Sequence, residues 1–287
     1  MGIRIITDST SDINDMQAKE LDITIIPLKV IFGDREYKEG IDITIEGFYE
    51  QLVKAEKLPT TSQPSPDDFL SSFLEAKKAG DSAVVILIAG KLSGTLQSAV
   101  IAKEMAEYED IHIVDSQITI TGLRFLVEHA VKLRREEKSA AEIVRALEEL
   151  KDRIVLLAMV DTLEYLHKGG RLSKTSAILG SLLKFKPIIT LKDGAIGVVA
   201  KERGTNKGIG KILEIIEEQG GMDSNYPVYY GYTADDSKTK LLMESVNRRY
   251  HVGDAQIHPV GCVVGTHAGP GACVITYISP EVHVQSM

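Results

Sequence analysis

Residues 83–100, AVVILIAGKLSGTLQSAV, decide the fold of this chain. The first six are apolar and mostly β-branched, which is typical of a strand buried on both faces of a sheet. The run breaks at Gly90 and then presents Ser93, Gly94 and Thr95, before an apolar stripe that predicts a helix packed on the sheet. A strand, a loop of small residues and a helix leave unpaired backbone N–H groups at the strand's carboxyl end. Such a place suits an anion.

Strands and helices alternate around this stretch. Apolar runs predict strands at residues 3–6, 23–30, 83–88 and 111–114. Amphipathic patterns between and after these runs predict helices, and the alternation continues through residue 150. It indicates a mostly parallel sheet with helices on both faces, which we assign to an N-terminal α/β domain, residues 1–151. In such sheets ligands bind beyond the carboxyl ends of the strands, where the loops after residues 6, 88 and 114 would lie.

A new strand at 153–160 places the domain boundary near Lys151 and begins a second α/β domain, residues 152–287. Further strands are predicted at 186–191, 196–199, 228–232, 255–259 and 273–278, with helices at 208–218 and 237–250. Asp193-Gly194 predicts a tight hairpin in this domain, as Gly33-Asp34 does in the first. The predicted fold class is therefore α/β with two domains, the second built on a mixed sheet.

Four local predictions rest on cap and turn residues. The polar residues 7–12 are expected to cap a helix beginning near Asp12. Three prolines predict a stiff loop at 59–66 that displays adjacent hydroxyls and ends where Ser65 or Pro66 opens a helix. Ser173 is expected to cap a very apolar helix, and residues 264–271 to form a glycine-rich loop centred on His267.

The composition excludes several partners. A net charge of −8 and a pI near 5.5 argue against nucleic acid or an anionic membrane as the main partner, because phosphate groups need a basic face. Cys262 and Cys273 have no metal-type spacing and stand in apolar surroundings, so buried, reduced thiols are expected. No apolar run approaches the ~18 residues that span a bilayer, and no signal peptide is evident. We expect a cytoplasmic protein.

Catalytic and cofactor motifs are absent or incomplete. Residues 205–212 lack the first glycine and the last hydroxyl of a phosphate-binding loop. In residues 90–94 the first glycine comes one position too early for a nucleophile elbow around Ser93. Residues 181–184 fit S-x-x-K without its companion motifs, and the seven histidines show no paired ligand spacing. We therefore assign no catalytic residue, no metal and no cofactor.

A few neutral donors and cations remain as candidate ligand groups: Thr61, Ser93, Thr95, Arg171, Arg203 and His267. Each also has an ordinary structural explanation. Thr61 would serve as a helix cap and Arg171 as a surface ion-pair partner, and a lone histidine is more often structural than functional. The glycines around His267 favour a functional role, because they permit close approach of the backbone to a ligand or another loop.

Seven blocks in order closely resemble the DegV family of bacterial fatty-acid-binding proteins. They are residues 7–12 (TDSTSD), 59–64 (PTTSQP), 92–95 (LSGT), 115–116 (DS), 166–173 (LHKGGRLS), 186–188 (KPI), and His267 with 269–271 (GPG). Any one block would be weak, but seven in register are specific. The resemblance covers residues 3–283, essentially the whole chain.

The resemblance implies one long-chain fatty acid, such as palmitate or stearate, with its carboxylate between two α/β domains and its acyl tail buried. Thr61 and Ser93 match the family's carboxylate-binding hydroxyls, with the amides of Gly94 and Thr95 beside them. The positions near the head group are matched by His267 and Arg203, and the resemblance also extends to Ser62 and Arg171. Some members are the binding subunit of fatty acid kinase and present the carboxylate to a separate ATP-dependent subunit, which forms acyl phosphate for phospholipid synthesis.

Three functions remain open from the residues. The first is a fatty-acid carrier that serves a kinase subunit, and it allows transient membrane contact. The second is a lipid sensor or carrier without a kinase partner, which needs the same pocket. The third is a small-molecule phosphotransferase, which rests on fold analogy alone. An aromatic content of 6% with no tryptophan suits an aliphatic tunnel. Acyl length, unsaturation, oligomeric state, and the roles of Arg171 and Arg203 in partner docking are not determined by the sequence.

Overall fold

The computed structural model describes residues 2–172 and 185–280. By its internal contacts the chain divides into two compact units. The first comprises Met1–Thr44 and Pro59–Lys151, and the second Ile45–Leu58 and Asp152–Met287. Each unit has its own main sheet and its own apolar core. Within the described ranges, no helix is both long and apolar enough to cross a membrane.

A four-stranded sheet forms the centre of the first unit. Its order is β2-β1-β6-β7, and all neighbouring strands run parallel. The strands are β1 (Ile3–Asp8), β2 (Ile23–Ile26), β6 (Ser82–Leu87) and β7 (Ile111–Asp115). All six residues of β6 are buried, as its continuous apolar run predicts. The predicted parallel sheet is confirmed.

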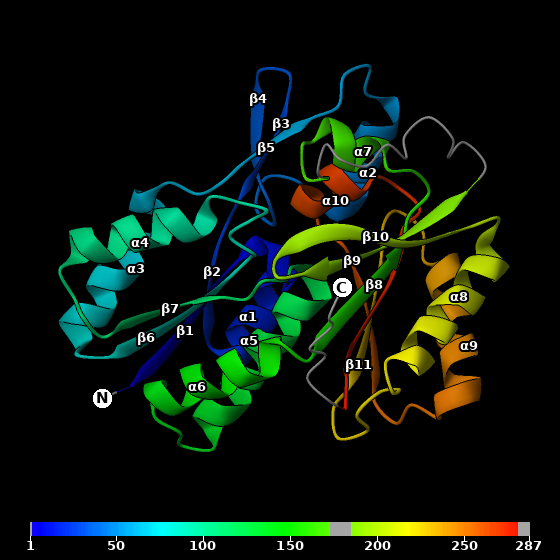
Figure 1. Ribbon diagram of the computed structural model, residues 1–287. Helices are drawn as coiled ribbons and strands as arrows, with labels where there is room; N and C mark the ends of the chain where they lie inside the picture. Colours follow the sequence, from blue (N-terminus) through cyan, green and yellow to red (C-terminus); the bar gives the residue numbers. More distant parts are fainter. Residues whose placement is uncertain (1, 173–184, 281–287) are drawn as a thin grey trace. The chain divides into compact units, whose positions relative to one another are not determined.

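Helices cover both faces of this sheet. Helices α3 and α4 pack together on one face, and α5 and α6 on the other (Figure 1). The helices of this unit are α1 (Asp15–Leu21), α3 (Pro66–Ala79), α4 (Thr95–Ala106), α5 (Ile120–Arg135) and α6 (Ala140–Lys151). Helix α3 begins as predicted, because Ser65 and Asp68 bond reciprocally to each other's backbone N–H in a capping box.

The strand order reverses between β1 and β6. From β1 the chain crosses to β2 on one side, and β6 later continues to β7 on the other. In open α/β sheets, ligands bind beyond the carboxyl ends of the strands at such a reversal point, which here lies between β1 and β6. The loop after β6 contains Ser93, so the topology places this residue at the expected ligand-binding edge.

A smaller sheet in the first unit corrects two predictions. Its order is β4-β3-β5, with β3 (Lys29–Phe32), β4 (Arg35–Lys38) and β5 (Thr60–Ser62) all antiparallel. The single strand predicted at 23–30 is wrong, because Pro27, which has no N–H to donate, lies between β2 and β3. The predicted loop at 59–66 is partly wrong, since residues 60–62 pair with β3. The hairpin turn at Gly33-Asp34 is confirmed.

The second unit is built on a six-stranded mixed sheet in the order β10-β9-β8-β13-β11-β12. Only β11 and β12 are parallel neighbours. The strands are β8 (Ile154–Met159), β9 (Lys186–Lys192), β10 (Ala195–Glu202), β11 (Val228–Tyr232), β12 (Ala255–Pro259) and β13 (Cys273–Ile278). The mixed sheet and the hairpin turn at Asp193-Gly194 are confirmed.

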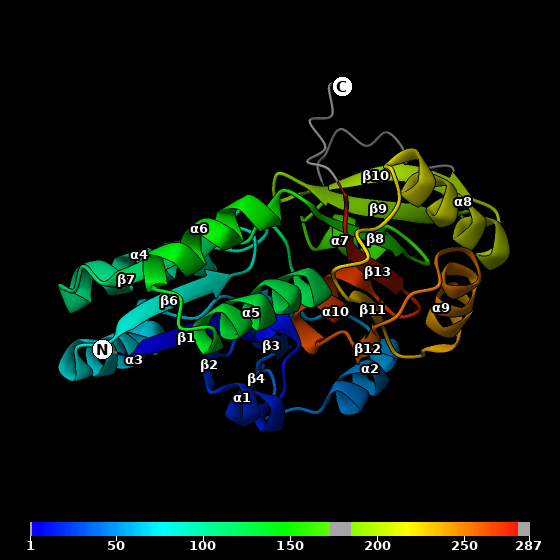
Figure 2. The same ribbon diagram turned by 90° about the horizontal axis from the view of Figure 1, so that it is seen from below.

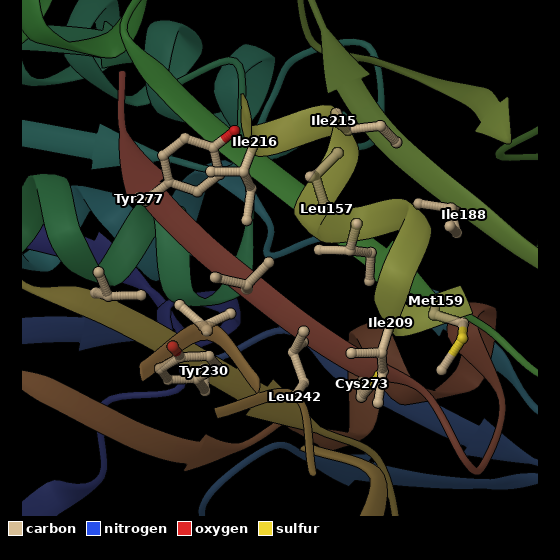
Figure 3. Packing of buried hydrophobic residues seen from close by; sticks show 14 residues of the cluster. Leu157, Met159, Ile188, Ile209, Ile215, Ile216, Tyr230, Leu242, Cys273 and Tyr277 are labelled. Carbon is tan, nitrogen blue, oxygen red and sulfur yellow. The ribbon is translucent and has the colours of Figure 1, made fainter. Parts of the chain in front are cut away.

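Two long helices, α8 (Thr205–Glu218) and α9 (Ser237–Tyr250), lie side by side against this sheet (Figure 2). Their apolar faces meet the strands in one buried cluster. Figure 3 shows Ile209, Ile215 and Ile216 of α8 facing strand residues such as Leu157 and Cys273. Cys262 and Cys273 are both buried thiols, as predicted, and burial raises the pKa of Cys273 to about 12.

Helix α2 (Ile45–Lys54) packs with the second unit, whereas the sequence prediction places it in domain 1–151. The cause is a set of contacts that lie far away in the sequence. Tyr49 donates its hydroxyl hydrogen bond to the carbonyl oxygen of Val260, at 2.9 Å. A Cβ atom on Gly265 would lie 2.9 Å from the ring of Phe48, so only glycine lets α2 approach this closely.

Two further local predictions change. Residues Cys262–Ala268, predicted within a glycine-rich loop, form helix α10, which packs against α2 and against α7 (Glu164–Lys168). The helix predicted near Asp12 begins at Asp15 with Asn14 as its N-cap, because Ser9–Ser11 form a separate short 3-10 helix. The helix predicted after Ser173 lies outside the described residues.

Candidate functional site

The loop after β6 is anchored to the end of β1 by a buried carboxylate. Asp8 is fully buried and accepts a hydrogen bond from the Ile88 N–H at 2.7 Å. It also accepts from the backbone N–H and the hydroxyl of Thr10, at 3.0 and 2.6 Å. Burial raises the pKa of Asp8 to about 6, and these hydrogen bonds oppose that rise. Asp8 therefore joins the two loops that flank the reversal point of the sheet.

The other side of the same loop is held by the last residue of β7 and the segment that follows it. The Ala89 N–H donates to the carbonyl oxygen of Ile118 at 2.9 Å, and the Gly90 N–H donates to Asp115 at 3.1 Å. The N–H of Ser93 turns back to the Ala89 carbonyl oxygen at 3.2 Å. With both sides bonded, the loop delivers Ser93 to a defined position.

The start of α4 presents two hydroxyls and a turn of N–H groups. The Ser93 and Thr95 hydroxyl oxygens lie 2.8 Å apart, and the Thr95 N–H donates to Ser93 Oγ at 3.3 Å. Gly94 is the N-cap of this 12-residue helix and, as a glycine, has no side chain that could cap it. The first N–H groups of a helix carry partial positive charge, so this arrangement can hold an anion.

Thr61 and Ser62 lie on strand β5, directly before a residue that contacts this helix. Thr61 pairs with Val30 of β3, and Ser62 donates its hydroxyl hydrogen bond to the Gln63 carbonyl oxygen at 3.2 Å. The next side chain reaches α4, because Gln63 Nε2 donates to the hydroxyl of Ser98 at 3.1 Å. The structure thus joins the segments that carry Thr61 and Ser93 through Gln63.

A second group of predicted residues comes together in the second unit. Helices α7 and α10 pack closely because Gly169 lacks a side chain: a Cβ atom there would lie 2.2 Å from His267 Nδ1. Arg171 donates to the Gly169 carbonyl oxygen at 2.6 Å and is close enough to affect His267 electrostatically. Gly269, with a φ of +72°, likewise makes room for the ring of Tyr165.

His267 is neutral at pH 7. Burial, with a smaller contribution from the charge of Arg171, lowers its pKa to about 4. One ring nitrogen of a neutral imidazole donates a hydrogen bond and the other accepts. Burial also lowers the pKa of Arg171, though an arginine remains charged.

Arg203 has a different neighbour from Arg171 and His267. It follows β10, and its guanidinium lies over the ring of Phe185, 4.9 Å from the ring centroid. Lys201 lies over the same ring at 6.0 Å. The expected grouping of Arg203 with His267 therefore stays a prediction.

An ion-pair cluster that sequence reasoning missed fixes the loop after α10. Asp161 accepts from Lys186 at 2.8 Å and from Lys238 at 2.5 Å, and Lys238 also donates to the Gly271 carbonyl oxygen. The two lysines hold the pKa of Asp161 below its usual range, against the effect of burial. The cluster positions the glycine-rich loop that follows His267.

No group of histidine, cysteine and acidic side chains with the geometry of a metal site occurs among residues 2–172 and 185–280. The candidate donors are hydroxyls, backbone N–H groups, a neutral imidazole and guanidinium groups. Such a set suits a carboxylate or another small anion.

Known proteins are similar to this chain over nearly its full length. A family model described as "Uncharacterised protein, DegV family" matches residues 2–280. A DegV domain-containing protein of Caldanaerobacter subterraneus is 35% identical over 275 residues, covering 96% of this chain and 98% of that protein.

Two solved structures carry a ligand in their descriptions. A fatty-acid-binding DegV family protein from Thermus thermophilus has a TM-score of 0.89 and 32% identity, covering 97% of this chain and 100% of its own. A stearic acid-binding protein from Eubacterium ventriosum has a TM-score of 0.88 and 29% identity, covering 97% and 98%.

Proposed function

This chain belongs to the DegV family, and on that premise we propose that it binds one long-chain fatty acid by its carboxylate. The observation that carries the proposal is the first turn of α4. Its N-cap residue, Gly94, has no capping side chain, and the Ser93 and Thr95 hydroxyls lie beside the first N–H groups of the helix, at the carboxyl edge of a parallel sheet. Solved relatives described as fatty-acid-binding proteins support the choice of anion.

In this proposal the hydroxyl groups of Ser93 and Thr61 donate hydrogen bonds to the carboxylate, and the N–H groups of Gly94 and Thr95 lie next to those hydroxyls. Each such donor contributes about 1.5–3 kcal/mol once water is excluded. The roughly sixteen methylenes of stearic acid contribute about 0.8 kcal/mol each when buried. The tail therefore dominates affinity, while the head group sets orientation. The role is binding and not catalysis.

The residues of the second unit enter on the family resemblance alone. We assign His267, Arg171 and Arg203 to recognition of the ligand or of a partner, and Ser62 to support of Thr61. The Ser62 hydroxyl is engaged with the Gln63 carbonyl oxygen, which favours support over direct ligand contact.

The finer proposal is that the bound carboxylate is presented to a separate ATP-dependent kinase subunit, which forms the acyl phosphate. The lack of a complete nucleotide motif in this sequence supports that division of labour. A lipid sensor or a stand-alone carrier would use the same pocket.

Identification of the co-purifying ligand tests the proposal. Native mass spectrometry of the purified protein should show one long-chain fatty acid per chain. After removal of that lipid, added stearic acid should bind at the same stoichiometry. Protein that carries no lipid and binds no stearic acid would overturn the proposal. ATP turnover by the isolated chain would favour a phosphotransferase instead.

A further inference from the structure

Gln63 connects the two segments that carry the proposed head-group hydroxyls. It directly follows β5, which contains Thr61, and its side chain reaches the first turn of α4, which follows Ser93. The side-chain amide of Gln63 donates a hydrogen bond to the hydroxyl oxygen of Ser98, which is 35 residues further along the chain. A hydrogen bond over this separation ties the segment after β5 to the first turn of α4.

Gly94 provides the space for this side chain. A Cβ atom on Gly94 would lie 2.0 Å from Gln63 Oε1, 2.6 Å from Cδ and 2.7 Å from Nε2. All three atoms of the carboxamide therefore lie against the Gly94 backbone. The φ of Gly94 is −75°, which any residue adopts, so conformational freedom does not explain the glycine. The space taken by the carboxamide does.

Ser98 fixes the other end of the contact. It is 3% exposed, and its N–H bonds to the Gly94 carbonyl oxygen, so Gly94 and Ser98 are the two ends of the first turn of α4. The Gln63 carboxamide spans this turn from one end to the other. Holding the exposed Gln63 side chain in one conformation costs conformational entropy, which opposes the stability gained from its hydrogen bond.

We propose that Gln63 is a positioning residue: its carboxamide clamps β5 onto the first turn of α4 and thereby sets the spacing between Thr61 and Ser93. Gly94 is the matching half of the clamp. The inference rests on the proposed function, because it assigns these hydroxyls to one carboxylate. Affinity for the tail is independent of the clamp, whereas preference for a carboxylate depends on it.

The test compares stearic acid with 1-octadecanol, which has the same chain length and no carboxylate. Dissociation constants are measured on lipid-free protein by displacement of a fluorescent fatty acid. Gln63→Ala should weaken stearic acid binding about threefold to tenfold, which corresponds to one lost hydrogen bond. Binding of 1-octadecanol should change by less than about twofold. The matched control is Gln97→Ala, which removes an exposed glutamine side chain from α4 and should change neither dissociation constant.

The glycine gives a second, independent arm. Gly94→Ala should expel the carboxamide and weaken stearic acid binding at least as much as Gln63→Ala. The double variant Gln63→Ala/Gly94→Ala has room for the methyl group and should return to the level of Gln63→Ala alone. Thermal melting of each lipid-free variant checks that it is folded.

The possible results separate the inference from the proposed function. Wild-type protein that prefers stearic acid over 1-octadecanol, with the preference kept in Gln63→Ala, would overturn the clamp alone. An equal loss for both ligands in Gln63→Ala would show a structural role and also overturn it. Wild-type protein that binds neither compound would overturn the proposed function, and the clamp with it.

Discussion

Ser93 is the residue on which the proposed head-group site depends most directly. Ser93→Ala removes one donor to the carboxylate and leaves the loop's backbone bonds in place. We expect stearic acid binding to weaken about tenfold to a hundredfold, from the loss of about 1.5–3 kcal/mol. Ser71→Ala, at an exposed position on α3, is the control for the same chemical change. Unchanged binding by Ser93→Ala would show that the head group lies elsewhere.

Asp8 predicts a dependence of stability on pH. Its pKa is raised from 3.8 to about 6, so the folded protein holds this proton more tightly than the unfolded chain does. The free energy of unfolding should therefore fall as the pH rises from about 4 to about 6, by up to about 3 kcal/mol. Asp8→Asn should remove this slope in urea titrations, whereas Asp34→Asn, in an exposed turn, should keep it. A slope that survives in Asp8→Asn would contradict the assignment.

His267 predicts the opposite trend. Its pKa is lowered from 6.5 to about 4, so the unfolded chain binds this proton more tightly. The free energy of unfolding should fall as the pH drops from 6.5 towards 4. Measured alone, each effect masks part of the other, so the difference between wild type and His267→Gln is the informative quantity. His167→Gln, on the exposed side of α7, should show no such difference.

At the scale of elements, the contact between α10 and α2 depends on Gly265. Alanine favours a helix over glycine, but a Cβ atom here would lie 2.5 Å from the hydroxyl oxygen of Tyr49. Overpacking outweighs helix propensity, and Gly265→Ala should destabilise the protein by about 1–3 kcal/mol. Gly210→Ala on α8 meets no atom within 4 Å and should instead stabilise it by up to about 1 kcal/mol. Melting temperatures that move in the same direction for both variants would contradict this account.

The elements that sequence predicts well are those whose signals are local. The apolar run of β6, the capping box of α3 and the two-residue turns of both hairpins each lie within a few neighbouring residues. Strand β5 escapes prediction because its pairing partner is Val30, and three short polar residues carry no strand signal of their own. The unit to which α2 belongs depends on Val260, which is 211 residues away from Tyr49.

At the scale of the whole molecule, some residues of the candidate site can be predicted from local sequence and others cannot. Ser93, Gly94 and Thr95 are predictable because a strand, a small-residue loop and a helix follow one another directly. Sequence patterns do not single out Asp8 or Gln63, because their hydrogen-bond partners lie 80 and 35 residues away. Asp8 caps the short 3-10 helix Ser9–Ser11 and not the predicted helix, and its bond to the Ile88 N–H is the one that orders the loop after β6.

Ligand removal is the prediction that belongs to the whole molecule. A ligand that binds only the folded chain adds RT ln(1 + [L]/Kd) to the free energy of unfolding, or about 2.7 kcal/mol at a hundredfold excess over Kd. Lipid-stripped protein should therefore melt several degrees lower than the protein as purified, and stearic acid should restore the melting temperature. Methyl stearate, which keeps the tail and removes the negative charge, should raise the melting temperature by less than stearic acid does. Full restoration by the ester would leave the carboxylate without a role, because the donors around Ser93 would then add nothing to the tail.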